Sequence, residues 1–162
     1  TQGDIKAVLR VLLLDGLATR QPLPPKFKRP VNFVASALRQ THAETDGGAA
    51  IHAYLQRMGQ LPFAWPTPDG FPDRNADWMT NLLPRWQFAL ALVSNEIPDA
   101  TALTAGRSTL PAQIDRLSEL FLGAPLPPPA NAALQQSLAA TTAEPATILA
   151  ATLLAAPAFQ WR

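Results

Sequence analysis

The sequence predicts an all-α fold, an irregular bundle of about seven or eight short helices joined by long proline-rich loops. Three observations support this fold class. Apolar residues recur at helical spacing in one segment after another. No segment shows the sustained alternation of apolar and polar residues, rich in β-branched side chains, that indicates a strand. The 17 prolines fall between the helical segments, where proline marks helix ends.

Composition indicates one domain. The chain has 162 residues, and 48% of them are hydrophobic, so we expect residues 1–162 to form a single helical domain. Charged residues make up only 15%, against roughly 25% in a typical domain, so we expect another domain or chain to cover part of the surface. Because the chain does not begin with methionine, we expect it to be the C-terminal fragment of a longer protein.

The first half of the chain contains three predicted helices. Asp4–Asp15 has apolar residues on so many sides that we expect a helix capped by Asp4 and buried on most of them. A proline-rich linker, Gln21–Arg29, leads to a second helix that Pro30 opens. The third helix follows Gly47 and Gly48 and ends at Gly59. The apolar stripes of the second and third helices are Phe33, Val34, Ala37 and Leu38, and Ile51, Tyr54, Leu55 and Met58.

The second half contains the remaining helices. We expect Asp77–Leu83 and Arg85–Asn95 to be helical, with Pro84 either kinking one long helix or separating two. Trp86, Leu90 and Val93 share one face there. After a loop at Ile97–Arg107, Ser108–Leu122 is the clearest amphipathic helix, with Ser108 as its N-cap. The linker Gly123–Ala130 leads to two alanine-rich helices, which are Asn131–Ala140 and Pro145–Ala156.

The loop Gly59–Asp73, with the sequence GQLPFAWPTPDGFPD, is the most distinctive segment. It combines stiff prolines with aromatic residues, and more tryptophans follow it. Aromatic faces can form a platform for a sugar or a peptide. The alternative is a structural plug, in which the loop folds back and buries its rings against the helix that follows. The candidate ligand or partner surface consists of Trp65, Phe71, Trp78 and Trp86.

Catalytic candidates are few. Asp69 and Asp73 are four positions apart and could act as an acid and a base. Arg85 could pair with either carboxylate or bind loop carbonyls, and so organise the turn. Asp69-Gly70 is also an ordinary turn dipeptide. These three residues are therefore the candidate catalytic residues, and whether the protein is an enzyme is left open.

Neither a metal site nor a cofactor site is predicted. Asp73, Asn75 and Asp77 resemble the start of a calcium loop, but Trp78 and Pro84 occupy the positions that require glycine and glutamate. The chain has no cysteine, which excludes disulfides and thiolate chemistry. The net charge of +1, with no basic stripe, argues against binding to nucleic acid. The longest apolar run is shorter than the ~20 residues that span a bilayer, so no membrane span is expected.

Several segments, in this order, resemble the C-terminal part of the DUF1800 family, a bacterial family of unknown function. They are GDIKAVLRVLL, KFKRPVNFVASALR, GQLPFAWPTPDGFPD with Trp78, RWQFALAL, and the terminal LLAAPAFQWR. The family usually has Ser-Pro-Glu-Phe-Gln near its end, where this chain has Ala156-Pro157-Ala158-Phe159-Gln160. The resemblance covers nearly the whole chain but only the last part of the family's length.

The resemblance implies a setting and a partner. Family members are often predicted to be exported and often encoded beside exported proteins, which implies a periplasmic or extracellular location and an exported partner protein. We expect this region to pack on the upstream portion of the same protein, with the loop Trp65–Asp73 helping to form the shared surface. One alternative is that it lines the cleft of an exported hydrolase or oxidoreductase through Asp69, Asp73 and Arg85. Another is a module that binds carbohydrate or peptide through Trp65.

Overall fold

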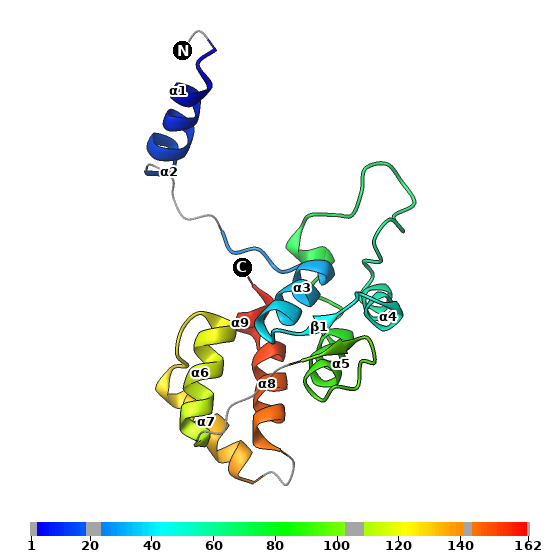
Figure 1. The fold of residues 1–162 in the computed structure, drawn as a ribbon, viewed down its shortest axis with the longest axis vertical. Helices are drawn as coiled ribbons and strands as arrows, with labels where there is room; N and C mark the ends of the chain where they lie inside the picture. The colour runs from blue at the N-terminus through cyan, green and yellow to red at the C-terminus, as the bar shows by residue number, and fades with distance from the viewer. Residues whose placement is uncertain (1–2, 19–23, 103–108, 141–143, 162) are drawn as a thin grey trace.

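The computed structural model describes residues 3–18, 24–102, 109–140 and 144–161, and helices dominate these ranges (Figure 1). The prediction of an all-α fold built from short helices is confirmed. The predicted linker residues 21–23, the end of the predicted loop at 103–107 and the predicted N-cap Ser108 lie outside the described residues. Among the described residues, no helix is long and apolar enough to cross a membrane.

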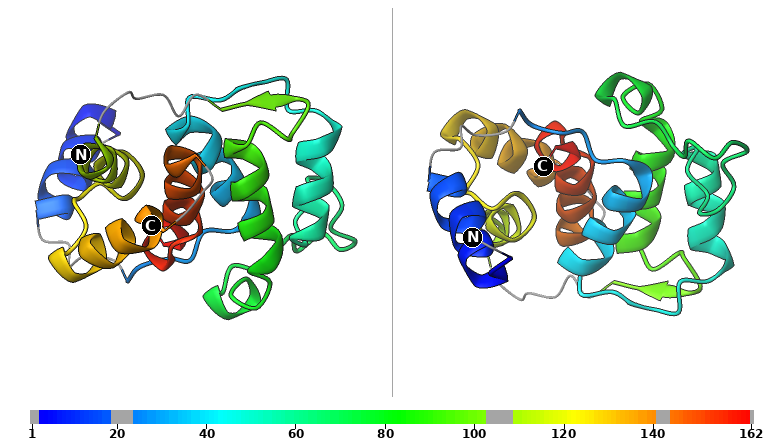
Figure 2. Two further views of the ribbon diagram at one scale, coloured as in Figure 1. Left: turned by 90° about the horizontal axis from the view of Figure 1, so that it is seen from below. Right: turned by 90° about the horizontal axis from the view of Figure 1, so that it is seen from above.

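The core is built around α8 (Pro145–Ala155), which is the central helix of the body (Figures 1 and 2). It packs against α5 (Leu83–Val93) on one side and against α6 (Leu110–Leu122) and α7 (Pro128–Ala139) on the other. A helix that is apolar all round is suited to such a position, because no side of it faces water fully. The last short helix, α9 (Pro157–Gln160), follows α8 directly and contributes Phe159 to the core.

The predicted helices with clear stripes form as expected. α3 (Pro30–Gln40) begins with Pro30 at its first position and buries Phe33, Val34 and Ala37. α4 (Ala49–Arg57) ends where Gly59 takes a left-handed φ of 86°. Thr109 holds the N-cap position of α6, and Gly123 ends that helix at a φ of 73°. Periodicity and terminal glycines were sufficient signals because both act within one helix.

Pro84 neither kinks a long helix nor separates two. The predicted helix Asp77–Leu83 does not form: the short 3₁₀ turn η2 (Asn75–Asp77) ends at Asp77, and α5 starts at Leu83 with Pro84 in its first turn. Proline fits the first turn because its missing N–H would have no partner there. A small antiparallel sheet between β1 (Glu44–Thr45) and β2 (Ala100–Thr101) was not predicted. Two-residue strands are too short to show a recognisable alternation of apolar and polar residues.

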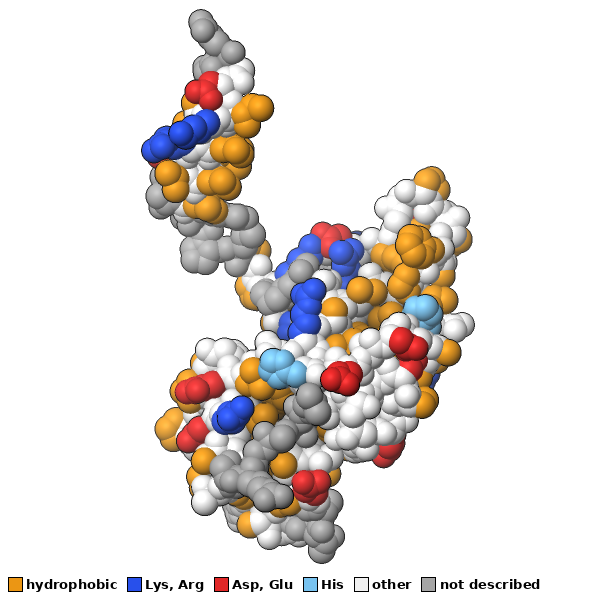
Figure 3. Space-filling view, viewed as in Figure 1, with side chains coloured by type: hydrophobic (Ala, Val, Ile, Leu, Met, Phe, Trp, Pro, Cys, Tyr) orange, Lys and Arg blue, Asp and Glu red, His pale blue; other side chains and the backbone are white. Residues whose placement is uncertain are grey.

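The predicted burial of the first helix is wrong. Helical structure runs from Asp4, whose carboxylate accepts hydrogen bonds from the backbone N–H groups of Lys6 (2.9 Å) and Ala7 (3.3 Å), through α1 (Ile5–Arg10), the π-helical turn η1 (Val11–Asp15) and α2 (Gly16–Ala18). The cap is therefore confirmed. Yet the segment stands apart from the body in Figure 1, and its large apolar side chains are exposed. Figure 3 shows apolar side chains along one side of it and basic ones along the other.

Candidate functional site

The predicted site residues lie at three features of the structure. They are the aromatic loop after α4, a buried arginine at the junction of α5 with the C-terminus, and an apolar groove between α5 and α8. The loop and the groove are open to solvent, whereas the arginine is enclosed.

The loop Gly59–Asp73 projects from the body as an extended arm (Figure 1). Every residue from Pro62 to Gly70 is exposed. Phe63 is the extreme case, because its side chain is 105% exposed and its backbone has a left-handed φ of 61°. A bulky residue with positive φ is a genuine conformational outlier. The arm therefore presents an aromatic side chain that has no packing of its own and stands on a strained backbone.

A row of aromatic rings connects the arm to the body. The Trp65 and Phe71 rings lie 4.9 Å apart, and the Phe71 and Trp78 rings lie 6.2 Å apart, measured between centroids. Trp78 is buried, and its indole N–H donates a 3.0 Å hydrogen bond to the Pro72 carbonyl. The base of the arm thus has the packing role expected of a plug, while the half of the loop that carries Phe63 and Trp65 faces solvent.

The Asp69 carboxylate belongs to the internal hydrogen bonding of this loop. It accepts hydrogen bonds from the Thr67 hydroxyl and from the Trp65 indole N–H, the latter at 3.2 Å. The Thr67 bond, and then the Trp65 bond, hold the pKa of Asp69 below its ordinary value. A carboxylate held in its charged form is a hydrogen-bond acceptor that orders the turn, and it is a poor proton donor near neutral pH.

Asp73 belongs to a different contact, with the segment that precedes α3. Its carboxylate lies 2.5 Å from Lys26 Nζ and 3.8 Å from the nearest Arg29 guanidinium nitrogen. The neighbouring Asn75 accepts a 2.9 Å hydrogen bond from the Phe27 backbone N–H, and Asp77 pairs with Arg74. The calcium-like residues are therefore each held by a separate protein group. Among the described residues, no cluster of three metal-ligating side chains occurs.

Arg85 is fully buried, with a side-chain exposure of 0%. One terminal nitrogen donates a 3.1 Å hydrogen bond to Gln160 Oε1, and the other donates a 2.8 Å bond to the Lys28 carbonyl. The guanidinium also lies 4.8 Å from the Phe27 ring centroid and 5.1 Å from that of Phe33, within cation–π range. Burial lowers the pKa of Arg85 to about 10, because the charged form loses hydration.

Gln160 and Lys28 complete this junction. The Gln160 side-chain amide donates a 3.1 Å hydrogen bond to the Leu154 carbonyl, and the backbone carbonyl of Gln160 accepts a 2.7 Å bond from the Lys28 backbone N–H. Next to it, the Phe27 ring packs edge-on against Trp161 at 5.2 Å. Arg85 thus fastens the segment before α3 and the C-terminal tail to α5, rather than organising the loop with Asp69 or Asp73.

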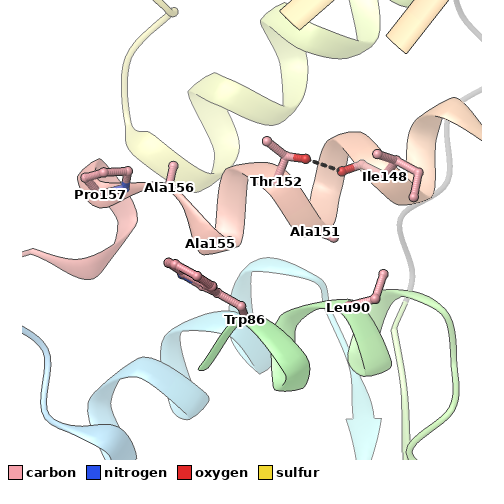
Figure 4. Close-up of a pocket in the computed structure, with 8 residues that line it drawn as sticks. All are labelled: Trp86, Leu90, Ile148, Ala151, Thr152, Ala155, Ala156 and Pro157. Carbon is pink, nitrogen blue, oxygen red and sulfur yellow. Dashed lines mark hydrogen bonds between the residues drawn. The ribbon is translucent and has the colours of Figure 1, made fainter. Parts of the chain in front are cut away.

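An apolar groove lies between α5 and α8, with Trp86 and Leu90 on its α5 side (Figure 4). Trp86 is 47% exposed and lines both this hollow, of about 580 Å³, and an adjoining one of about 210 Å³. The groove exists because Ala151 and Ala155, four positions apart on α8, leave the space that larger side chains would fill. The larger hollow is lined by Trp86, Leu90, Ile148, Ala151, Thr152, Ala155, Ala156 and Pro157, and the smaller by Phe27, Met79, Leu82, Trp86, Ala155, Pro157, Gln160 and Trp161.

The structure thus separates the residues singled out in the sequence. Trp65, Phe71 and Trp78 form one row, whereas Trp86 belongs to the groove, and Arg85 lies in the core. No role was predicted for Lys28 and Gln160, although both lie in segments that carry the family resemblance. The groove was not predicted either, and its only sequence signal is the spacing of four between Trp86 and Leu90 and between Ala151 and Ala155.

Comparison with known protein families gives a match over nearly the whole chain. A family model with the description "Protein of unknown function (DUF1800)" matches residues 1–161 of the chain. No curated protein and no solved structure matches it.

Proposed function

The chain belongs to the DUF1800 family, and from that premise we propose that it is a helical association region, which packs on an upstream portion of the same protein through the loop Gly59–Asp73. In this proposal Phe63 and Trp65 contact the partner surface, and the loop acts as a rigid arm. The observation that carries the proposal is the state of Phe63. Its side chain is fully exposed and its backbone is strained, so the residue contributes no stability to the isolated chain.

The backbone strain of Phe63 can be offset by burial of its side chain against a partner. A non-glycine residue in the left-handed region costs roughly 1–2 kcal/mol, and Phe63 makes no compensating packing contact at 105% exposure. Burial of one such side chain against a partner would contribute about 1.5–3 kcal/mol. Outliers of this kind cluster at binding sites, where the strain belongs to a preorganised conformation.

The arm has the rigidity that preorganisation requires. Four prolines restrict its backbone, and the row from Trp65 through Phe71 to Trp78 anchors it to the body. A rigid loop loses little conformational entropy when it binds, so more of the contact energy appears as affinity. This combination favours a protein partner with a pocket that receives Phe63.

The two alternative functions have weaker support. A cleft lined by Asp69, Asp73 and Arg85 would need these side chains to converge, but they engage the loop, Lys26 and Gln160 respectively. A carbohydrate platform would have to rest on Trp65 alone. The neighbouring Phe71 ring is inclined by 50° to it and does not extend its flat face. Neither alternative accounts for the strained conformation of Phe63.

The proposal extends to location. Family resemblance supports a periplasmic or extracellular protein, with an exported protein as a further partner. Fractionation of cells that express the full-length gene with a C-terminal tag would test the location. Recovery of the tagged protein only from the cytoplasm would contradict it.

The association is tested by calorimetric titration of this chain with the polypeptide encoded directly upstream in the same gene. Phe63→Gly should weaken binding about tenfold or more, since the anchor is lost. The same change should maintain or raise the thermal stability of the free chain, because glycine tolerates positive φ. Val31→Ser, at another exposed apolar position, is the matched control. Equal affinity of wild type and Phe63→Gly would show that the arm is not the contact.

A further inference from the structure

Two apolar surfaces are open to solvent in the part of the chain that the structure describes. One is formed by the exposed large apolar side chains of the helical segment Ile5–Ala18, and the other is the groove between α5 and α8. We propose that they are partners in a dimer, in which the segment Ile5–Ala18 of each copy docks in the groove of a second copy. This pairing uses a surface other than the arm and goes beyond the proposed function.

The segment has the properties of a docking helix. Its exposed large side chains include Val8 (43%), Leu9 (48%) and Leu12 (63%), and they extend over much of its circumference. Lys6 and Arg10, four positions apart, form a basic side. Isolated helices shorter than about 12–15 residues are marginal in water, so this helix needs a packing surface to remain folded.

The groove has the chemistry and the length to receive it. Neither hollow is lined by a charged side chain, so an apolar face fits and a basic side would remain in water. The Thr152 hydroxyl already donates to the Ile148 carbonyl at 2.7 Å (Figure 4), so this hydroxyl needs no partner from a docked helix. The part of α8 that lines the larger hollow, Ile148 to Ala155, corresponds to about 12 Å, within the roughly 21 Å of a helix from Ile5 to Ala18.

The two hollows adjoin each other, because Trp86, Ala155 and Pro157 line both of them. A helix with apolar anchors one turn apart suits such a pair. Side chains three or four positions apart on a helix, such as Leu9 and Leu12 or Leu13, can enter two such hollows at once. This is the arrangement by which amphipathic helices bind grooves in general.

A second copy is the occupant that satisfies both surfaces together. In the structure each chain leaves its own groove open although its own helix is present (Figure 1). Each copy supplies one helix and one groove, so two copies can exchange helices about a twofold axis and leave neither surface exposed.

The absence of cysteine makes a direct test practical. Val8→Cys and Ala155→Cys chains, each carrying a single cysteine, are mixed and oxidised. The proposal predicts a disulfide-linked dimer that contains one chain of each kind. It also predicts that a chain with both changes, oxidised at low concentration, forms dimers in preference to an internal cross-link. An internal cross-link as the main product would overturn it, because the helix would then fill the groove of its own chain.

Analytical ultracentrifugation supplies the second measurement. The dimer dissociation constant should rise about tenfold or more for Leu90→Glu in the groove and for Leu12→Glu on the helix. Leu83→Glu is the control, because Leu83 is exposed on α5 but lines neither hollow. Phe63→Gly should leave the dimer intact, which distinguishes this proposal from the association through the arm. A monomer up to about 100 μM, or a dimer insensitive to both glutamate changes, would overturn the proposal.

Discussion

Arg85 and Gln160 meet in the core, where a guanidinium nitrogen of Arg85 lies 3.1 Å from Gln160 Oε1. Through this contact a residue at the start of α5 fixes the last turn of the chain. The Arg85 Nε atom has no hydrogen-bond partner among the described residues, so the cation depends on its two terminal nitrogens. Removal of either partner should therefore have a disproportionate effect on stability.

Gln160→Leu should destabilise the chain by about 2–3 kcal/mol. The substitution removes the acceptor of a buried cation and the donor to the Leu154 carbonyl, and both groups then stay unsatisfied. Urea unfolding followed by circular dichroism measures the change. Gln87→Leu is the control, since Gln87 is exposed and bonds only to the exposed Arg57 side chain in the described part of the chain. Losses of equal size in the two variants would contradict a special role for Gln160.

The stability of the wild type relative to Arg85→Met should rise as the pH passes about 10. Burial lowers the pKa of Arg85 from its ordinary value to about 10, so above about pH 10 the unfolded chain holds the proton and the folded chain releases it. Stability rises with pH wherever the unfolded state binds more protons. Below pH 10 the side chain is charged in both states, and the desolvation cost is fully present. Urea midpoints at about pH 8 and about pH 10.5 give the comparison, and an unchanged difference would contradict the lowered pKa.

The order of the arm should depend on pH at the acid end. The pKa of Asp69 is lowered from its ordinary value of 3.8, first by the Thr67 hydroxyl and then by the Trp65 indole. The stabilisation is fully present above the unfolded pKa and is lost as the pH falls through the folded pKa. Trp65 fluorescence should therefore change below about pH 4, and Asp69→Asn should abolish that transition. Loss of the fluorescence change in Trp65→Phe would show that Trp65 is its source. A transition that persists in Asp69→Asn would show that a group other than Asp69 causes it.

Trp78→Phe should loosen the base of the arm. The substitution retains a ring next to Phe71 but removes the 3.0 Å hydrogen bond to the Pro72 carbonyl, a loss of about 1 kcal/mol. We expect faster proteolysis between Pro62 and Gly70, the exposed part of the loop. Trp86→Phe is the matched control, because Trp86 lies in the groove and not in the row. Equal cleavage rates in the two variants would show that Trp78 does not anchor the arm.

Local signals were sufficient for much of the fold. Pro30 at the start of α3, the stripe of α6 and the terminal Gly59 and Gly123 all lie where the sequence placed them. The errors have one cause in common. The helix predicted at Asp77–Leu83 does not form. The turn η2 lies before it, and there the Asn75 side chain accepts a hydrogen bond from Phe27, 48 positions away. The exposed face of Ile5–Ala18 likewise could not be read from its pattern, because apolar side chains predict burial without naming what covers them.

The sequence by itself determined the helical class, most helix starts and ends, the stiffness of the loop Gly59–Asp73 and the family. These follow from periodicity, capping and proline geometry, which act over a few residues. Only the tertiary structure decided that Arg85 meets Gln160 rather than Asp69 or Asp73, that Phe63 faces solvent, and that Trp86 stands in a groove. The surroundings of these three residues depend on residues far apart in the chain, and the packing between helices determines them.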